Sequence, residues 1–236
     1  MELGFIQDMF NHIAPRYDLL NRLLSLRRDV YWRRGMAAAL AVPKTGRVLD
    51  VACGTGDVVI ELIHQAKAGN HVIGLDFAPE MLVVAQKKLA ARRRKTRTDL
   101  IAGNGLTLPF LPGTFDAMTI AFGIRNIMDR KSALQEFYAH LKPGGQLAVL
   151  ELSTPKPQLF KFLYSLYFER ILPAIGGFFS SNRMAYQYLP ASVLRFPEPE
   201  AFAGLMRAAG FEDIRWRRLT LGLATLHIGF KPSVFK

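Results

Sequence analysis

The chain is poor in cysteine, in acidic residues and in long apolar runs. Its single thiol, Cys53, excludes an internal disulfide, which favours a reducing compartment such as the cytoplasm. No run approaches the ~20 uninterrupted apolar residues that a transmembrane helix needs. The opening MELGFIQDMFNH also lacks the basic start and apolar stretch of a secretory signal. We therefore expect a cytoplasmic protein without a membrane span.

What is abundant is apolar and basic. Half of the 236 residues are apolar, enough for one large globular unit with its own core. The net charge is +12, and arginine and lysine crowd RRDVYWRR (27–34) and KKLAARRRKTR (87–97). Such clusters suit nucleic acid, an anionic lipid surface or simply water. Charge alone does not choose among these three.

Strand and helix patterns alternate along the first two thirds of the chain. Apolar strand-like segments occur at 47–53, 71–77, 99–104, 115–122 and 145–152. Helical patterns between them occur at 57–66, 79–93 and 129–141. This alternation predicts an α/β fold, doubly wound, with a mostly parallel sheet and helices on both faces.

The alternation of strands and helices ends after the fifth predicted strand. Residues 153–196 form an insertion rich in Phe and Tyr, a helix follows at 198–210, and two closely spaced strands at 212–220 and 225–231 predict an antiparallel C-terminal hairpin. The total is a seven-stranded sheet. We expect a single domain over 1–236, with an N-terminal helical cap at 1–45 and a helical, aromatic lid insertion at 153–196.

The segment VLDVACGTGDV indicates a cofactor site. A strand ends, Gly54 and Gly56 allow a tight turn close to a ligand, and a helix begins. Asp76 ends the second strand twenty residues later, where a carboxylate can accept both ribose hydroxyls. Val59 replaces the third glycine of a dinucleotide site, and Asp57 would repel phosphate but tolerate a sulfonium. S-adenosylmethionine fits this pattern best.

A second site is indicated by AFGIRN, residues 121–126. The preceding segment, FDAMTIAF, is apolar on both faces, so it predicts a buried strand. Ligands of open α/β sheets gather at the carboxyl ends of the strands. A glycine followed by Arg125 at such an end predicts a cation aimed at a methyl acceptor.

The whole chain resembles the UbiE/MenG family of quinone-biosynthesis C-methyltransferases. The resemblance rests on YDLLNRLLSLRRDVYW, LDVACGTGD, GNGLTLPF, FDAMTIAFGIRN and LKPGGQLAVLELSTP. The first and last are distinctive of the family, whereas CGTGD and KPGG are typical of class I methyltransferases in general. The resemblance thus implies the class I methyltransferase fold and an S-adenosylmethionine-dependent enzyme, without metal, acting on a prenylated quinol ring, most simply demethylmenaquinol.

The resemblance also assigns site residues. Cofactor residues fall on Asp50, Gly54, Thr55, Gly56, Asp76, Asn104, Gly105 and Ala121. It gives Arg125 a catalytic role, and beside it we expect Asn126 to take part in catalysis by holding Arg125 or the acceptor and Tyr17 and Asn21, on the N-terminal segment, to contact the substrate from the other side. Two positions depart from the family pattern: Ala121 stands where serine is frequent, and Asp29 stands where histidine is usual.

Arginine remains protonated near neutral pH, so the expected role of Arg125 is to stabilise a quinolate oxygen directly or through a water. Nucleic acid is not expected as a substrate, because Cys53 lies in the cofactor turn and AFGIRN is not an amino-methylation motif. A different phenolic or lipid-like acceptor, or a non-catalytic scaffold that binds the cofactor, remain alternatives. Aromatic residues of the lid predict transient contact with an anionic membrane, peripheral to its inner face, or a homodimer interface.

Overall fold

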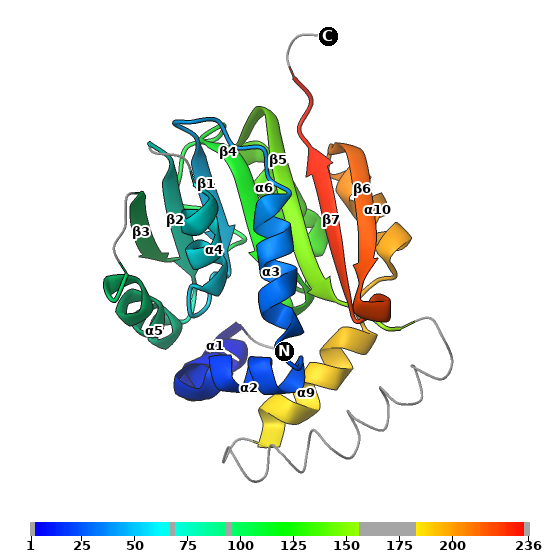
Figure 1. Cartoon of the computed structure of the whole chain (residues 1–236). Helices are drawn as coiled ribbons and strands as arrows, with labels where there is room; N and C mark the ends of the chain where they lie inside the picture. The colour runs from blue at the N-terminus through cyan, green and yellow to red at the C-terminus, as the bar shows by residue number, and fades with distance from the viewer. Residues whose placement is uncertain (1–2, 67–68, 93–95, 156–182, 234–236) are drawn as a thin grey trace.

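A computed structural model describes residues 3–66, 69–92, 96–155 and 183–233, and its centre is one sheet in the order β3-β2-β1-β4-β5-β7-β6 (Figure 1). The five strands β1 to β5 pair in parallel, and β7 runs antiparallel to both β5 and β6. The strands are β1 Arg47–Val51, β2 His71–Asp76, β3 Arg97–Ala102, β4 Phe115–Ala121, β5 Leu141–Leu152, β6 Glu212–Leu219 and β7 Ala224–Phe230. The predicted sheet and its terminal hairpin are confirmed.

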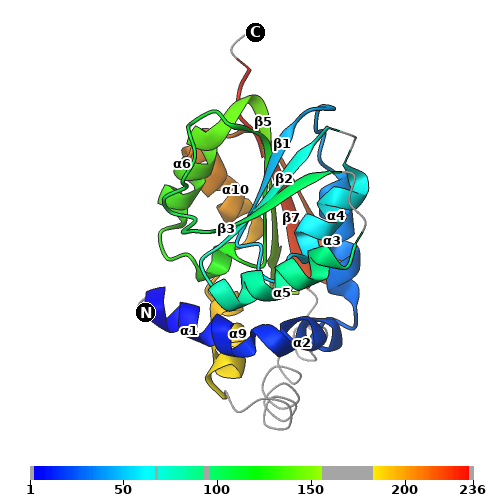
Figure 2. The same cartoon turned by 90° about the vertical axis from the view of Figure 1, so that its left-hand side faces the viewer.

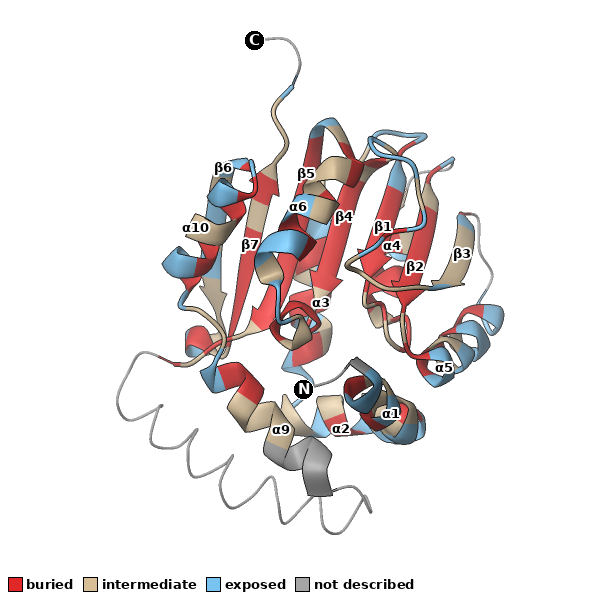
Figure 3. Cartoon of the chain, turned by 180° about the vertical axis from the view of Figure 1, so that it is seen from behind, coloured by how far each residue is buried: buried red, intermediate tan, exposed pale blue. Residues whose placement is uncertain are grey.

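Helices cover both faces of this sheet, as the doubly wound pattern predicts (Figures 1 and 3). One face packs against α3 (Arg28–Ala38), α4 (Asp57–Gln65) and α5 (Pro79–Ala90), and the other against α6 (Arg130–His140) and α10 (Pro199–Ala208). A hydrophobic core lies on each face of the sheet, and successive strand residues point into opposite cores. Val48 packs in the core beneath α3 and α4, and Leu49 packs in the core beneath α6 and α10. Both faces of the central strands are therefore apolar, which explains their unbroken hydrophobic sequences.

Several strand boundaries differ from the predicted ones, most clearly those of β5, β1 and β3. β5 begins at Leu141, which pairs with Phe115, and its register with β4 then shifts, so that Ala117 pairs with Gln146. The KPGG segment, residues 142–145, mostly precedes the predicted strand but is an irregular early part of β5. β1 ends at Val51, because Ala52 adopts φ 53° and turns the chain. β3 ends at Ala102, so Asn104 lies beyond the strand and bridges to Thr107.

The remaining helices lie below the carboxyl ends of the parallel strands (Figure 2). They are α1 (Leu3–Ile13), α2 (Tyr17–Leu24) and α9 (Arg183–Leu194), with 3-10 turns η1 (Ala14–Arg16) and η2 (Ile124–Asn126) beside them; a further turn, η4 (Thr220–Gly222), joins β6 to β7. Residues 1–45 thus supply α1 and α2 at the strand ends and α3 on the sheet face. Most of the predicted lid, 156–182, lies outside the described residues.

Candidate active site

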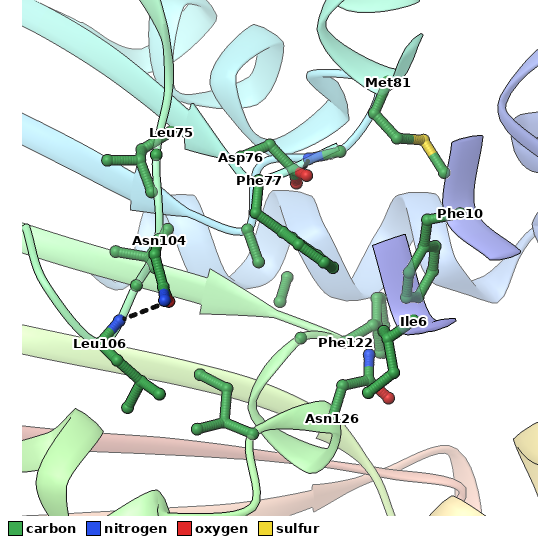
Figure 4. Close-up of a pocket in the computed structure, with 18 of the residues that line it drawn as sticks. Ile6, Phe10, Leu75, Asp76, Phe77, Met81, Asn104, Leu106, Phe122 and Asn126 are labelled. Carbon is green, nitrogen blue, oxygen red and sulfur yellow. Dashed lines mark hydrogen bonds between the residues drawn. The ribbon is translucent and has the colours of Figure 1, made fainter. Parts of the chain in front are cut away.

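A cavity of about 320 Å³ lies at the carboxyl ends of β1, β2 and β4, below the sheet and against α1 and α2 (Figure 4). Its wall is mostly apolar, with few polar groups, as is usual for small-molecule sites. The lining residues are Ile6, Phe10, Tyr17, Val51, Ala52, Gly54, Leu75, Asp76, Phe77, Met81, Gly103, Asn104, Gly105, Leu106, Ala121, Phe122, Gly123, Asn126, Ile127, Met128 and Asp129.

Two non-glycine residues of this wall have left-handed backbones. Ala52 has φ 53° and Phe122 has φ 57°, directly after the ends of β1 and β4. Such conformations cost of order 1–3 kcal/mol each and cluster at functional sites. The turns after β1 and β4 are in close contact: a Cβ added at Gly123 would lie only 2.8 Å from the Cβ of Ala52. Glycine at 123 therefore permits the close approach of the β1 and β4 turns.

The glycine turn after β1 contributes mainly through Gly54. This residue has φ 53° and lines the cavity, whereas Gly56, with φ 80°, precedes α4 and packs against Ala85. Thr55 is buried, and its hydroxyl donates to Asp18 at 2.5 Å and accepts from Lys88 at 3.2 Å. Of the predicted turn residues, only Gly54 borders the cavity; Thr55 and Gly56 hold the turn.

Asp76 joins the glycine turn to the start of α5. Its Oδ2 accepts from the Gly54 N–H at 2.7 Å, and its Oδ1 accepts from the Ala78 N–H at 2.9 Å. Burial raises the pKa of this carboxyl despite these two hydrogen bonds. Each carboxylate oxygen has a second lone pair, so Asp76 can still accept hydroxyl donors from a ligand. It lines the cavity, as predicted.

Asn104 and Gly105 border the cavity after β3. The Asn104 Oδ1 accepts from the Leu106 N–H at 2.9 Å (Figure 4). This bond leaves the amide Nδ2 as a donor. A Cβ added at Gly105 would lie 2.9 Å from the Cγ1 of Val51, so the chain here runs against the end of β1.

Asp50 lies elsewhere than the other predicted cofactor residues. It is buried within β1 and does not line the cavity. Its Oδ1 accepts from the Thr119 hydroxyl at 2.7 Å, and its Oδ2 is without a partner among the described residues. Burial raises the pKa of Asp50 to about 8. The structure places this carboxyl behind the wall of the site, mostly protonated at neutral pH.

Arg125 is buried in η2, directly after β4. Its Nη1 donates to Glu151 Oε1 at 2.7 Å and to the Phe122 carbonyl at 2.5 Å. Burial, the largest single influence, would lower the pKa of Arg125, but the Glu151 carboxylate together with Tyr17 and Tyr188 raises it overall. The acidic partner of Arg125 is therefore Glu151 and not the nearby Asp129. Asp129 instead caps α6 by accepting from the Ser132 N–H at 3.0 Å.

Arg125 itself does not line the cavity, but its neighbours in the chain do. Asn126 borders the cavity and its Oδ1 accepts from the Tyr188 hydroxyl of α9 at 3.1 Å. Burial raises the pKa values of Tyr17 and Tyr188, and the Arg125 charge opposes both increases. Arg125 is thus electrostatically coupled to two phenols, one from α2 and one from α9.

The other predicted contacts are distributed as follows. Tyr17 and Ala121 line the cavity. Asn21 lies one helical turn after Tyr17 and hydrogen-bonds to its phenol. Ala121 is the last residue of β4, so its methyl group stands where the family frequently has a hydroxyl.

A charged cluster fastens α2 to the glycine turn. Lys88 of α5 donates to Asp18 of α2 at 2.6 Å and also bonds Asp57, the first residue of α4. Arg33 pairs with Asp57 at 3.5 Å and with Asp29, the position that departs from the family pattern. Burial would raise the pKa of Asp57, but Arg33 and Lys88 lower it. Asp57 is therefore ionised, and Asp29 has a defined role as a buried partner of Arg33.

Sequence reasoning missed Glu151, Tyr188 and the α1 side chains Ile6 and Phe10. The signal for Glu151 was present, because it is the acid inside the otherwise apolar segment QLAVLEL. Tyr188 and the α1 residues carry no local signal. Within the described ranges, no cluster of three or more His, Cys, Asp or Glu side chains is arranged to hold a metal ion, and no helix has the length and hydropathy to cross a membrane.

Comparison with known proteins decides the family. Residues 2–231 match the ubiE/COQ5 methyltransferase family. The chain belongs to this family. It is 49% identical over 226 residues to the ubiquinone/menaquinone biosynthesis C-methyltransferase UbiE of Geobacter sp. (strain M21), covering 96% of each chain. It is 50% identical over 225 residues to the demethylmenaquinone methyltransferase of Thermus thermophilus, covering 95% of this chain and all of that protein.

Solved structures agree on the fold. The phosphoethanolamine N-methyltransferase 2 of Haemonchus contortus, in complex with S-adenosyl-L-methionine, superposes with a TM-score of 0.64 at 16% identity, covering 85% of this chain and 52% of that one. This likeness supports the class I methyltransferase fold. The predicted family, fold and enzyme class, an S-adenosylmethionine-dependent C-methyltransferase of the quinone-biosynthesis family, are confirmed.

The cavity has the chemistry that this cofactor needs. Asp76 offers a buried carboxylate for a ribose, Asn104 offers an amide donor for a base, and the left-handed glycine turn exposes backbone close to the ligand. The surrounding wall is mostly apolar. The residues present therefore fit S-adenosylmethionine.

Proposed function

We propose that this enzyme methylates a ring carbon of a prenylated quinol, and that its acceptor is demethylmenaquinol. The match over nearly the whole chain to a relative named demethylmenaquinone methyltransferase carries this proposal. The site supports it, because a buried cation lies beside an apolar cavity and two phenols. Such surroundings favour an aromatic acceptor that must lose a proton.

The cofactor-binding roles follow from the cavity wall. Asp76 holds the ribose hydroxyls, Asn104 and Gly105 contact the adenine, and Gly54 lets the turn approach the ligand closely. Asp50, Thr55 and Gly56 support these residues from behind, through the Thr119 hydrogen bond and the Lys88 cluster. The bound cofactor supplies an electrophilic methyl group on a sulfonium.

The chain's own contribution to the reaction centres on Arg125. Loss of the proton from a ring hydroxyl to water gives a quinolate, whose neighbouring carbon becomes the nucleophile for the methyl group, with S-adenosylhomocysteine as the leaving group. Loss of the proton at that carbon to water restores aromaticity, and the ring oxygen takes back one proton, so that the products are the methylated quinol, S-adenosylhomocysteine and one proton. A fixed guanidinium stabilises the negative oxygen as it forms. Asn126 holds the acceptor on one side, and Tyr17 with Asn21 closes the other.

An assay with matched acceptors tests this proposal. Purified protein is incubated with S-adenosylmethionine labelled in the methyl group and with short-chain demethylmenaquinol, the corresponding benzoquinol precursor, or a simple lipophilic phenol. We expect transfer to the naphthoquinol, at ring carbon, to be fastest. Faster transfer to the phenol would favour the alternative of another phenolic acceptor, and no transfer to any would favour a cofactor-binding scaffold.

The same proposal places the enzyme at the inner face of the membrane, where a prenylated acceptor resides. Leu19, Leu23 and Leu26, on or just after α2, are exposed, with Leu26 82% exposed. The exposed Arg22 and Arg27 lie among them. Apolar side chains interleaved with arginine suit a shallow contact with anionic lipid, worth about 1 kcal/mol for each basic residue near the surface.

Liposome flotation tests this placement. The protein should float with anionic vesicles, less so at high salt, and Leu23→Ser together with Leu26→Ser should weaken binding. Methyl transfer to a short-chain, water-soluble acceptor should be unaffected by this pair. Absence of flotation with anionic vesicles would remove the membrane contact while leaving the chemical proposal intact.

A further inference from the structure

Among the acidic residues that the structure describes, Glu151 is the most completely buried, and the proposed reaction does not use it. It lies near the end of β5, has no exposed surface, and follows the buried run Leu147 to Leu150. A buried carboxylate is costly unless hydrogen bonds and an opposite charge compensate it. Its partners therefore indicate what it is for.

All of its hydrogen bonds go to the chain around Arg125 or to its own neighbour. Oε2 accepts from the Arg125 backbone N–H at 3.1 Å, and Oε1 accepts from the Arg125 Nη1 at 2.7 Å. Oε1 also accepts from the Leu152 N–H at 2.8 Å. One carboxylate thus fixes both the backbone and the side chain of the same arginine.

We propose that Glu151 is the positioning residue of the methyl-transfer site: it holds the Arg125 guanidinium in place for the acceptor oxygen. This inference rests on the proposed role of Arg125.

The β4 turn needs such a restraint. The last pair of the β4–β5 ladder is Ala121 with Leu150, after which Phe122 takes its left-handed conformation. The strand ladder therefore cannot hold Arg125. Glu151 follows Leu150 directly, and its side chain replaces the missing backbone contacts.

Glu151 also sets the charge that the acceptor meets. At Tyr188 the two charges oppose each other, because Arg125 lowers the pKa of this phenol and Glu151 raises it, whereas at Tyr17 the Arg125 charge lowers the pKa. The Arg125 Nε has no hydrogen-bond partner among the residues described, so one donor remains for a ligand or water. Removing the Glu151 charge would leave a full positive charge in the same buried place, no longer fixed.

Two effects of Glu151→Gln follow, and they can be separated. Loss of the ion pair lets the guanidinium move, so turnover falls by about 10²-fold, the scale of a lost transition-state contact. The uncompensated positive charge lowers the pKa of the acceptor hydroxyl, so the rise of turnover with pH moves to lower pH by about one unit. A merely structural ion pair would lower stability without moving the pH profile.

Whether Glu151 restrains the Arg125 side chain can be measured without any substrate, by solvent exchange of the Arg125 Nε–H. In a protein labelled with ¹⁵N at arginine, the Nε–H signal of Arg125 is assigned by its absence in Arg125→Lys. We expect slow solvent exchange of this signal in the wild type and at least tenfold faster exchange in Glu151→Gln. Glu61→Gln is the matched control, because it removes a carboxylate that pairs with Arg34 on α3. In Glu61→Gln, solvent exchange of the Arg125 Nε–H should stay as slow as in the wild type.

Turnover completes the test. In an Arg125→Lys background, Glu151→Gln should cause little further loss, because both changes remove the same interaction. Unchanged Nε–H exchange in Glu151→Gln would overturn the proposal, as would fully additive losses with an unshifted pH profile. A wild type that transfers no methyl group to short-chain demethylmenaquinol counts against the proposed function instead, and the exchange comparison still decides whether Glu151 holds Arg125.

Discussion

At the carboxyl ends of β2 and β3, polar side chains bond to backbone N–H groups; at the ends of β4 and β5, polar side chains bond to each other. Asp76 accepts from Gly54 and Ala78, and Asn104 accepts from Leu106. Arg125 instead pairs with Glu151. In the first region backbone N–H groups hold the polar side chains in preformed turns, whereas the second region contains a buried pair of opposite charges.

This difference has an energetic consequence. A side chain bonded to backbone can be shortened at the cost of a few hydrogen bonds, each worth about 1 kcal/mol net. A buried ion pair is less tolerant, since removal of one member leaves the other charge unpaired and costs of order 3–5 kcal/mol. Substitutions at the two ends of the cavity should therefore affect affinity and turnover to different degrees.

The largest effect is expected at the β4 end. Arg125→Lys keeps a positive charge but loses the planar fork that reaches both Glu151 and the Phe122 carbonyl. Turnover at saturating cofactor should fall by about 10²-fold or more, because a transition-state contact is lost. Methyl transfer to short-chain demethylmenaquinol, followed by mass spectrometry, measures this.

Cofactor affinity is the control for that variant, and calorimetry should find it within about threefold of wild type. Arg125→Ala is less informative alone, because it leaves the buried Glu151 carboxylate without its ion-pair partner and can also destabilise the fold. Turnover near the wild-type value in both variants would show that the pair is only structural.

The next effect belongs to the β2 end. In the proposed binding mode, Asp76→Ala removes two charge-assisted hydrogen bonds to the ribose, individually worth about 1.5–3 kcal/mol, so cofactor affinity should weaken at least tenfold. Titration calorimetry measures it. The matched control is Asp116→Ala, which removes a carboxylate that likewise accepts a backbone N–H, from Arg47 at 2.8 Å, but away from the cavity wall. Unchanged affinity in folded Asp76→Ala would contradict the ribose role.

The same contrast explains how much the sequence could predict. Asp76 and Gly54 follow from a strand, a turn and a fixed spacing, because their partners lie within one βαβ unit. The sheet and its hairpin follow from apolar periodicity for similar reasons. Glu151 contacts Arg125, which lies 26 positions earlier in the chain, and Tyr188 contacts Asn126, which lies 62 positions earlier. No local sequence pattern encodes such distant pairs. The left-handed Ala52 and Phe122 are tertiary too, since the packing of two turns imposes them.

A smaller effect is expected where α2 meets the glycine turn. Lys88→Met removes the cation shared by Asp18, Thr55 and Asp57. The cluster is partly exposed, so its charge interactions are modest and screened by salt. Cofactor affinity should fall about threefold, and the wild-type advantage should shrink in high salt. Arg92→Met, at an exposed position on the next turn, is the control, and an equal loss there would mean that the cluster does not fasten the turn.

The smallest effect concerns Asp50, which lies behind the cavity wall. Its pKa is about 8 in the folded protein, well above the ordinary value near 3.8. Between these pH values the folded state binds one proton more than the unfolded state, so this group makes stability fall as pH rises from about 4 to about 8. Asp50→Asn cannot titrate. Its Tm relative to wild type should therefore rise by a few degrees between pH 6 and pH 9.

Thr119→Val provides the comparison for this last measurement. In the wild type, the Thr119 hydroxyl donates to Asp50 and thereby lowers the pKa of that carboxyl. The substitution removes this hydroxyl but keeps the titrating carboxyl of Asp50. The raised pKa should rise further, so this variant keeps a stability that falls with pH, over a range extended to higher pH. Differential scanning fluorimetry across pH 5 to pH 9 distinguishes the two substitutions. If Asp50→Asn and wild type lose the same number of degrees over that range, the pKa of Asp50 is not raised in the folded protein, and the prediction is wrong.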